Sequence, residues 1–560
     1  MNRRQAVLGI AAAFTVGIAL RTWPLWHSPL PFNPDGIIYA RFVHDTVRTG
    51  SLPLSRMHVD ELAFTSFLTT ISHVTGLDAL RHAQPAIAVV GTVPVLLAAA
   101  FAGRIAAGTR LDALGRRYAA VLAAVVLAVE GLYLHRSMPV DEQTLGLALV
   151  PLALLAVAYA SRRDARWWFV ALPTLLVVPA VHNLDAFVLA LALVLLAVLA
   201  LDSAELGRLR SLGTLAIGFF AYFATYNVAT QTLTDASINQ QDRLTTVPGL
   251  ILAWLVLAAI GLRWFTSRRD STKRTLLASV LLTWFVVLAV NALAPIFPGL
   301  PSTHPTILYG IAPLVLLVVL LAYGLPDVLD TTEGTSLLAG LAAVVVLVGI
   351  SLTASLTADY LNTLYRVQTF SHLPVVTIAA VAAARISTRT GLLDDIPGFD
   401  RRRPSARTAA GALAVVVVLA SVASIPIAYG GLDVLPYKGV TTPAELQSTG
   451  FAERHVPGAW TSDDHLTRMT PYYTSAGDGR RGPTDAYLTG SPPPGCPMLV
   501  QASWSTTGAQ RYPQTAAVVP PPRLEATMIT SHVVYHTGGA DPISLTIARS
   551  AADDCTNSSV

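Results

Sequence analysis

The chain has 560 residues, of which 53% are hydrophobic and only 13% are charged. A soluble domain carries roughly 25% charged residues, so this composition excludes an ordinary soluble enzyme. The formal net charge is +4, and the sequence has no basic stripe interleaved with aromatic residues. We therefore expect no nucleic-acid partner.

The hydrophobic residues lie in long runs, and a run of about 18 or more can cross the hydrocarbon core of a bilayer. The first run follows Arg3 and Arg4 and has no small-residue cleavage site, which favours a signal anchor over a removed signal peptide. We predict a polytopic α-helical membrane protein with about thirteen transmembrane helices. The predicted segments are 6–22, 84–103, 118–134, 144–160, 167–181, 185–201, 211–230, 247–264, 275–294, 306–323, 336–353, 373–386 and 408–428.

The distribution of arginine and lysine predicts the orientation of these helices. With the N-terminus in the cytoplasm, the cytoplasmic connections hold most basic residues, in clusters within 104–117, 263–274 and 385–407. The outer connections hold only scattered arginines. An odd number of spans then places the C-terminal part outside the cell, as in a multi-pass protein of the cell membrane.

The composition changes near residue 430. The tail is rich in Pro, Gly, Ser and Thr and contains short strand-like runs such as 498–501 and 543–548. We predict a transmembrane domain at 1–429 and a small α/β or mostly β extracytoplasmic domain at 430–560. Both cysteines, Cys496 and Cys555, lie in the tail, where either a disulfide or two free thiols fit the sequence.

The first outer loop, 23–83, places a carboxylate at the membrane surface. Asp35 lies between Pro34 and Gly36, which shape a turn, and the residues that follow predict an amphipathic helix in the interface. An acidic residue in such a loop often serves only a structural cap. The bilayer edge is also where the polar head of a lipid-linked molecule lies, which makes Asp35 a candidate catalytic residue.

The second outer loop is short and contains Asp141 and Glu142 at the predicted start of a helix. Carboxylates there are stabilised by the helix dipole, so capping alone accounts for them. The functional alternative requires them to face Asp35 across a cavity. Neighbouring carboxylates raise the pKa of one of them and create a base that can accept a hydroxyl proton.

With the Asn33-Pro34-Asp35-Gly36 motif, interfacial helices after it, the Asp141-Glu142 loop, many spans and an outer tail, the chain resembles the GT-C superfamily of membrane glycosyltransferases. The resemblance implies transfer of a sugar from a polyprenyl-phosphate carrier to a glycan or glycoprotein acceptor outside the cytoplasm. It implies that Asp35 deprotonates the acceptor hydroxyl, with inversion at the anomeric carbon, and that the reaction needs no metal and no other cofactor.

The leaving phosphate needs positive partners in the outer loops. Arg366 is the first candidate because a guanidinium matches phosphate geometry, and Arg136 and His304 are the next. Each of these residues also fits the interpretation of an ordinary interfacial or loop residue.

Further details of the sequence bear on the reaction class. The oligosaccharyltransferase branch of the superfamily carries a Trp-Trp-Asp-Tyr-Gly motif, which does not occur after residue 430, and this favours transfer of a single sugar. The arginine-rich, lysine-poor composition looks haloarchaeal. In that setting the chain resembles dolichol phosphate-mannose mannosyltransferases that complete the N-glycans of surface-layer glycoproteins.

Two alternatives belong to other classes. A transporter or flippase of lipid-linked sugars would have ionisable residues in mid-span and broken helices in corresponding halves, and the sequence has few such residues, with Glu130 as an exception. A non-catalytic envelope scaffold would bind partners through its outer tail. About thirteen spans exceed what anchoring alone requires.

Overall fold

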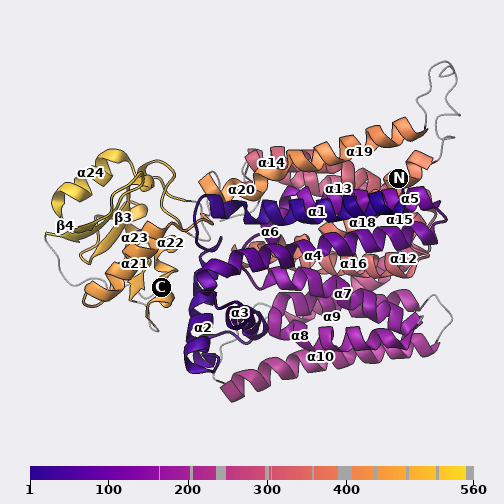
Figure 1. The fold of residues 1–560 in the computed structure, drawn as a ribbon, viewed down its shortest axis with the longest axis horizontal. Coiled ribbons are helices and arrows are strands. Elements are labelled where there is room, and N and C mark those ends of the chain that lie inside the picture. The colour runs from indigo at the N-terminus through magenta and orange to yellow at the C-terminus, as the bar shows by residue number, and fades with distance from the viewer. Residues whose placement is uncertain are drawn as a thin grey trace.

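A computed structural model gives the fold as a bundle of long helices with a smaller strand-containing region at one end (Figure 1). The described residues are 1–162, 164–201, 206–234, 247–294, 296, 302–303, 305–355, 358–388, 406–433, 438–474, 478–511 and 516–549. Among them, eleven helices are long and apolar enough to cross a membrane, and twelve if one bent pair forms a single span.

The bundle is built from segments throughout the first three quarters of the chain. Its helices are α1 (Arg3–Thr22), α4 (Ala79–Gly108), α5 (Ala113–Val129), α6 (Gly131–Ser137), α7 (Gln143–Arg162), α8 (Trp168–Val181), α9 (Asn183–Ala200), α10 (Leu206–Thr234), α12 (Pro248–Thr266), α13 (Asp270–Leu293), α14 (Pro305–Ile311), α15 (Val315–Val328), α16 (Thr332–Ala354), α17 (Ala358–Gln368), α18 (His372–Thr388), α19 (Ala406–Ala423) and α20 (Ile425–Asp433).

The polytopic helical fold predicted from the sequence is confirmed, and the predicted hydrophobic segments fall largely on helical residues. Segments 118–134, 306–323 and 408–428 are each divided between consecutive helices. The count differs from about thirteen for two physical reasons. α8 with its preceding turn, Ala165–Val181, is too short to be counted as a full span, and α5 meets α6 at a bend of 63° instead of continuing straight.

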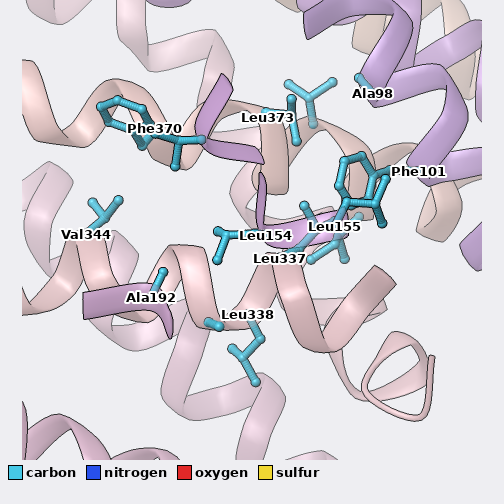
Figure 2. Packing of buried hydrophobic residues seen from close by; sticks show 14 of the residues in the cluster. Ala98, Phe101, Leu154, Leu155, Ala192, Leu337, Leu338, Val344, Phe370 and Leu373 are labelled. Atoms are coloured by element: carbon cyan, nitrogen blue, oxygen red, sulfur yellow. The ribbon is translucent and has the colours of Figure 1, made fainter. Parts of the chain in front are cut away.

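The core of the bundle is almost entirely aliphatic, with a few aromatic rings. Figure 2 shows Phe101 of α4, Leu154 of α7, Leu337 of α16 and Leu373 of α18 among the side chains of this core. Close packing of helices far apart in the sequence fixes the positions of the helix ends, because a packed interior resists displacement of its elements.

Two helices of the first outer loop lie at one end of the bundle. α2 (Asp35–Thr49) and α3 (Leu62–Thr75) both end at a glycine in the left-handed conformation, Gly50 and Gly76, which closes a helix without strain. α2 lies between the helix ends and the strand-containing region, and the N-terminus lies at the opposite end (Figure 1).

The C-terminal region is a five-stranded mixed sheet with short helices. The strand order is β2-β1-β3-β5-β4, with parallel pairs among β1, β2 and β3 and antiparallel pairs of β5 with β3 and β4. The elements are α21 (Pro443–His455), β1 (Trp460–Thr461), α22 (Asp464–Thr467), β2 (Gly479–Arg480), α23 (Gly482–Leu488), β3 (Met498–Gln501), α24 (Pro521–Thr530), β4 (Ser531–His536) and β5 (Ile543–Ala548). Cys496 is disulfide-bonded, and Cys555 lies outside the described residues.

The sheet region packs on α2 through apolar side chains. Ile37 of α2 is fully buried in one cluster with Leu466 and Met469 of the C-terminal region. The backbone N–H of Asn33 donates to the carbonyl of Gly439 at 2.7 Å. The segment that carries Asp35 is therefore held between the bundle and the sheet region.

Candidate functional site

Asp35 occupies the first turn of α2, where the helix dipole favours a carboxylate. The preceding Asn33 has a φ of 95°, a left-handed conformation that asparagine tolerates better than most residues. Its side-chain amide donates to Asp35 Oδ2 at 3.3 Å. Asp35 Oδ1 also lies 3.4 Å from Arg468 Nε of the C-terminal region, and 29% of the Asp35 side chain remains exposed.

A buried glutamine joins the two outer loops to the bundle. Gln84 of α4 accepts the backbone N–H of Phe32 at 2.9 Å and donates to the carbonyls of Arg21 and Met138, each at 2.9 Å. The N–H of Val140 also donates to the Phe32 carbonyl at 3.0 Å. These bonds bring the loop that contains Asp35 against the loop that contains Asp141 and Glu142.

The Asp141-Glu142 pair predicted from the sequence contacts α2 through Tyr39, which lies one helical turn after Asp35. Tyr39 donates a short hydrogen bond through its phenol to Glu142 and lies 3.5 Å from Glu61 Oε1. Asp141 caps α7 by accepting the N–H of Gln143 at 3.0 Å, so its capping role is real. It also lies 3.9 Å from the guanidinium of Arg366.

The start of α9 and the end of α17 add a histidine, another carboxylate and the arginine. His182 Nε2 lies 3.6 Å from Glu142 and 3.4 Å from Arg366, while its Nδ1 lies 3.0 Å from Asp185. The side chains of His182 and Asp185 are fully buried. Asp60, before α3, accepts the N–H of Asn183 at 3.1 Å and so ties the first outer loop to α9.

Carboxylates outnumber cations in this cluster, and the pKa values of the carboxyl groups shift in opposite directions. Burial, followed by the charge of Asp141, raises the pKa of Glu142 well above its usual range. Burial also raises the pKa of Glu61 to about 8. Although burial opposes it, Arg366 and His182 lower the pKa of Asp141. At neutral pH the cluster thus holds both protonated and ionised carboxyl groups.

The remaining predicted residues have different outcomes. Arg136 is half-buried at the end of α6 and interacts electrostatically with Tyr365, the neighbour of Arg366. His304 lies outside the described residues. Glu130 caps α6 through the N–H groups of Leu132 and Tyr133 and lies 2.7 Å from His372 Nδ1, so it has a structural role.

Five residues of the cluster were not singled out by the sequence analysis, namely Tyr39, Asp60, Glu61, His182 and Asp185. The sequence held one usable signal. Between the hydrophobic segments 167–181 and 185–201 the connection is very short, and it begins with His182-Asn183. Polar residues in such a connection lie at a helix end, where they face neighbouring loops.

Two cavities among the described residues lie elsewhere. One, of about 30 Å³, is apolar and is lined by core residues including Phe101, Leu154 and Phe370. The other, of about 650 Å³, is polar and lies where α4, α7 and α18 end, with Arg162 and Arg385 in its wall. Neither is lined by Asp35 or Glu142, so the predicted cavity between these groups stays a prediction.

Within the described ranges, no group of three or more His, Cys, Asp or Glu side chains is arranged to hold a metal ion. The expectation of metal-free chemistry is not tested by this finding.

Among known proteins, the chain is similar in fold to solved structures. No family model and no curated protein sequence matches the chain. The oligosaccharyltransferase of Archaeoglobus fulgidus in its apo form matches with a TM-score of 0.55 at 11% identity, over 90% of this chain and 70% of that one. The chain therefore shares its overall fold with this oligosaccharyltransferase.

Two further solved structures match with lower scores. The complex of the same oligosaccharyltransferase with Zn and sulfate gives a TM-score of 0.47 at 12% identity, over 83% of this chain and 61% of that one. ArnT from Cupriavidus metallidurans in the apo state gives 0.37 at 13% identity, over 96% and 97% of the two chains. Scores this low carry no argument about function.

Proposed function

We propose that this protein transfers a single sugar from a polyprenyl-phosphate carrier to an acceptor hydroxyl outside the cell, with inversion. In this reaction Asp35 accepts the proton of the acceptor hydroxyl, whose oxygen attacks the anomeric carbon. The bond from that carbon to the phosphate oxygen breaks, and the phosphate takes the electron pair. Arg366 stabilises the negative charge that develops on the phosphate.

The observation that carries the proposal is the meeting of two outer loops and two helix ends at one end of the bundle. There a partly exposed carboxylate, Asp35, lies one helical turn before Tyr39 on α2. The Tyr39 phenol donates to Glu142, which lies in one cluster with His182 and Arg366. Asp35 Oδ1 also lies 3.4 Å from Arg468 Nε of the C-terminal region, so its carboxyl group faces a positive charge.

The proposed identities of the donor and the acceptor come from the sequence resemblance. Mannose on dolichyl phosphate is the proposed donor, and the N-glycan of a surface-layer glycoprotein is the proposed acceptor. Arg468 places the C-terminal region beside Asp35, so an acceptor that reaches Asp35 passes along this region.

The alternatives gain no support from particular residues. A flippase would use ionisable residues within the spans, but Glu130 serves as a helix cap paired with His372. A scaffold requires no cluster of buried carboxyl groups around an arginine, and such a cluster is costly to bury.

The test is transfer by the purified protein in lipid nanodiscs with dolichyl-phosphate sugars. Asp35→Asn should lower the transfer rate by about 10²–10⁴-fold, the usual contribution of a positioned base, while the donor still binds. A scaffold would be unaffected, and a flippase would show altered lipid translocation with no defect for a donor supplied outside.

The matched control is Asp78→Asn. Asp78 is an exposed carboxylate that caps α4 by accepting the N–H of Leu80 at 2.8 Å, and asparagine caps a helix about as well. This variant should keep the wild-type rate. Equal rates for the Asp35 variant and the wild type would refute the role of Asp35.

A further inference from the structure

A continuous series of ionisable side chains runs through the cluster behind Asp35. Glu61 lies 3.5 Å from the Tyr39 phenol, which donates a hydrogen bond to Glu142. Glu142 in turn lies 3.6 Å from His182, beside Arg366. The series therefore begins at the first outer loop and ends at the guanidinium proposed to hold the phosphate.

Glu61 and Glu142, the two carboxyl groups that contact the Tyr39 hydroxyl, differ from the other carboxylates of the site. Asp141 faces Arg366 and accepts a backbone N–H, and Asp185 pairs with His182. Glu142 makes its shortest contact with the Tyr39 phenol. Glu61 accepts the backbone N–H of His58 at 2.7 Å and lies 3.5 Å from the same phenol, so neither carboxyl group has a cation as its nearest partner. The charged and titratable groups around them are Asp35, Asp60, Asp141, His182, Asp185 and Arg366.

We propose that Glu142 donates a proton to the departing polyprenyl phosphate and that Glu61 reloads Glu142 through the Tyr39 hydroxyl. This inference rests on the proposed function, in which Asp35 is the general base, and adds Glu142 as a general acid. In it Glu142 is a catalytic residue because it contacts the phosphate, whereas Tyr39 and Glu61 act through it.

The atoms and charges balance in this scheme. The acceptor proton moves to Asp35 as the new glycosidic bond forms, and the phosphate departs with the electrons of the broken bond. The Glu142 proton moves to a phosphate oxygen. Tyr39 then gives its phenolic proton to Glu142 and takes the proton of Glu61, which regains one from water, while Asp35 releases its proton to water.

The protonation states fit these roles. Burial raises the pKa of Glu61 to about 8, so Glu61 carries a proton at pH 7. Burial, followed by the charge of Asp141, raises the pKa of Glu142 well above its usual range, which favours its acid form. A raised pKa keeps the acid form below that pKa and loses it above. A rate that depends on protonated Glu61 should therefore fall as the pH rises through about 8.

The experiment measures kcat and KM for transfer from a short-chain polyprenyl-phosphate sugar between about pH 5.5 and 9.5, a range that brackets the expected fall. Glu142→Gln should lower kcat by about 10²-fold or more at every pH, since an amide cannot donate a proton. Glu61→Gln and Tyr39→Phe should each lower kcat by about 10-fold, leave KM unchanged and remove the fall near pH 8. The variant that carries both Glu61→Gln and Tyr39→Phe should be no slower than either single variant, because the two residues act in the same proton path.

The matched control for Tyr39→Phe is Tyr226→Phe, which removes a half-buried phenol that donates to the carbonyl of Val59 at 2.7 Å. This variant should retain the alkaline fall. The relay is wrong if the Glu61 and Tyr39 variants keep both the wild-type rate and the alkaline fall while Asp35→Asn is inactive. If Asp35→Asn is fully active, the proposed function fails and the relay fails with it.

Discussion

At the scale of single residues, the site depends on one close approach in α7. A Cβ added to Gly146 would lie 1.6 Å from Asp185 Oδ2 and 3.0 Å from Asp185 Cβ. Asp185 is buried and bonded to His182, so it has little room to move. The absence of a side chain at position 146 allows the carboxylate to orient His182 beside Glu142.

Gly146→Ala should therefore displace Asp185, break its contact with His182 and lower the stability of the protein by about 1–3 kcal/mol, as overpacking of a filled site does. Thermal unfolding of the purified protein in detergent measures the effect. Gly340→Ala on α16 is the control, because its Cβ would meet only Leu154 at an ordinary 3.5 Å. An unchanged melting temperature for Gly146→Ala would contradict this account of the packing.

The sequence predicted Asp35, Asp141, Glu142 and Arg366 as site residues because each lies in a short polar segment between apolar runs. Their spatial relations depend on Gln84, which is the first residue of the predicted span 84–103. Its three loop contacts join segments more than 50 residues apart. Long-range hydrogen bonds of this kind leave no local pattern.

At the scale of elements, the bend between α5 and α6 shows how a charge is accommodated in an apolar run. Segment 118–134 was predicted as one helix, but the chain bends by 63° there. Glu130 ends α5, and its carboxylate accepts two N–H groups at the start of α6 and pairs with His372. The partner of this charge is 242 residues away, which is why periodicity could not reveal the bend.

Glu130→Ala should destabilise the protein by about 3–5 kcal/mol, because it leaves His372 and the start of α6 without their buried partner. Unfolding in denaturing detergent, followed by circular dichroism, measures the loss. Glu130→Gln retains acceptors for the N–H groups and should cost less. Stability of the alanine variant equal to that of the wild type would show that the pair does not maintain the bend.

At the scale of the whole molecule, the polytopic helical fold was predictable because hydrophobic runs of membrane length carry a strong signal. The sheet of the C-terminal region was predictable only in part. β3 and β5 match predicted runs, but β1 and β2 have two residues each and are defined by long-range pairing. The N-terminus and this region lie at opposite ends of the bundle (Figure 1), and we propose that the sheet region is extracellular.

Cysteine labelling in whole cells tests this orientation. A cysteine at exposed Ser491 should react with a membrane-impermeant thiol reagent from outside, because the positive residues favour a cytoplasmic N-terminus. A cysteine at exposed Arg116, at the other end of the bundle, should react only after the membrane is permeabilised. The reverse pattern would place the candidate site in the cytoplasm and exclude an outer acceptor.

The most direct test of the central claim is the stereochemistry of the transfer. The purified protein is given a panel of dolichyl-phosphate sugars of known anomeric configuration, and nuclear magnetic resonance identifies the product while mass spectrometry follows the lipid. A carboxylate that activates the acceptor for direct attack predicts release of dolichyl phosphate and a glycosidic bond of inverted configuration. A product of retained configuration, or a panel of donors left wholly unconsumed, would contradict the account.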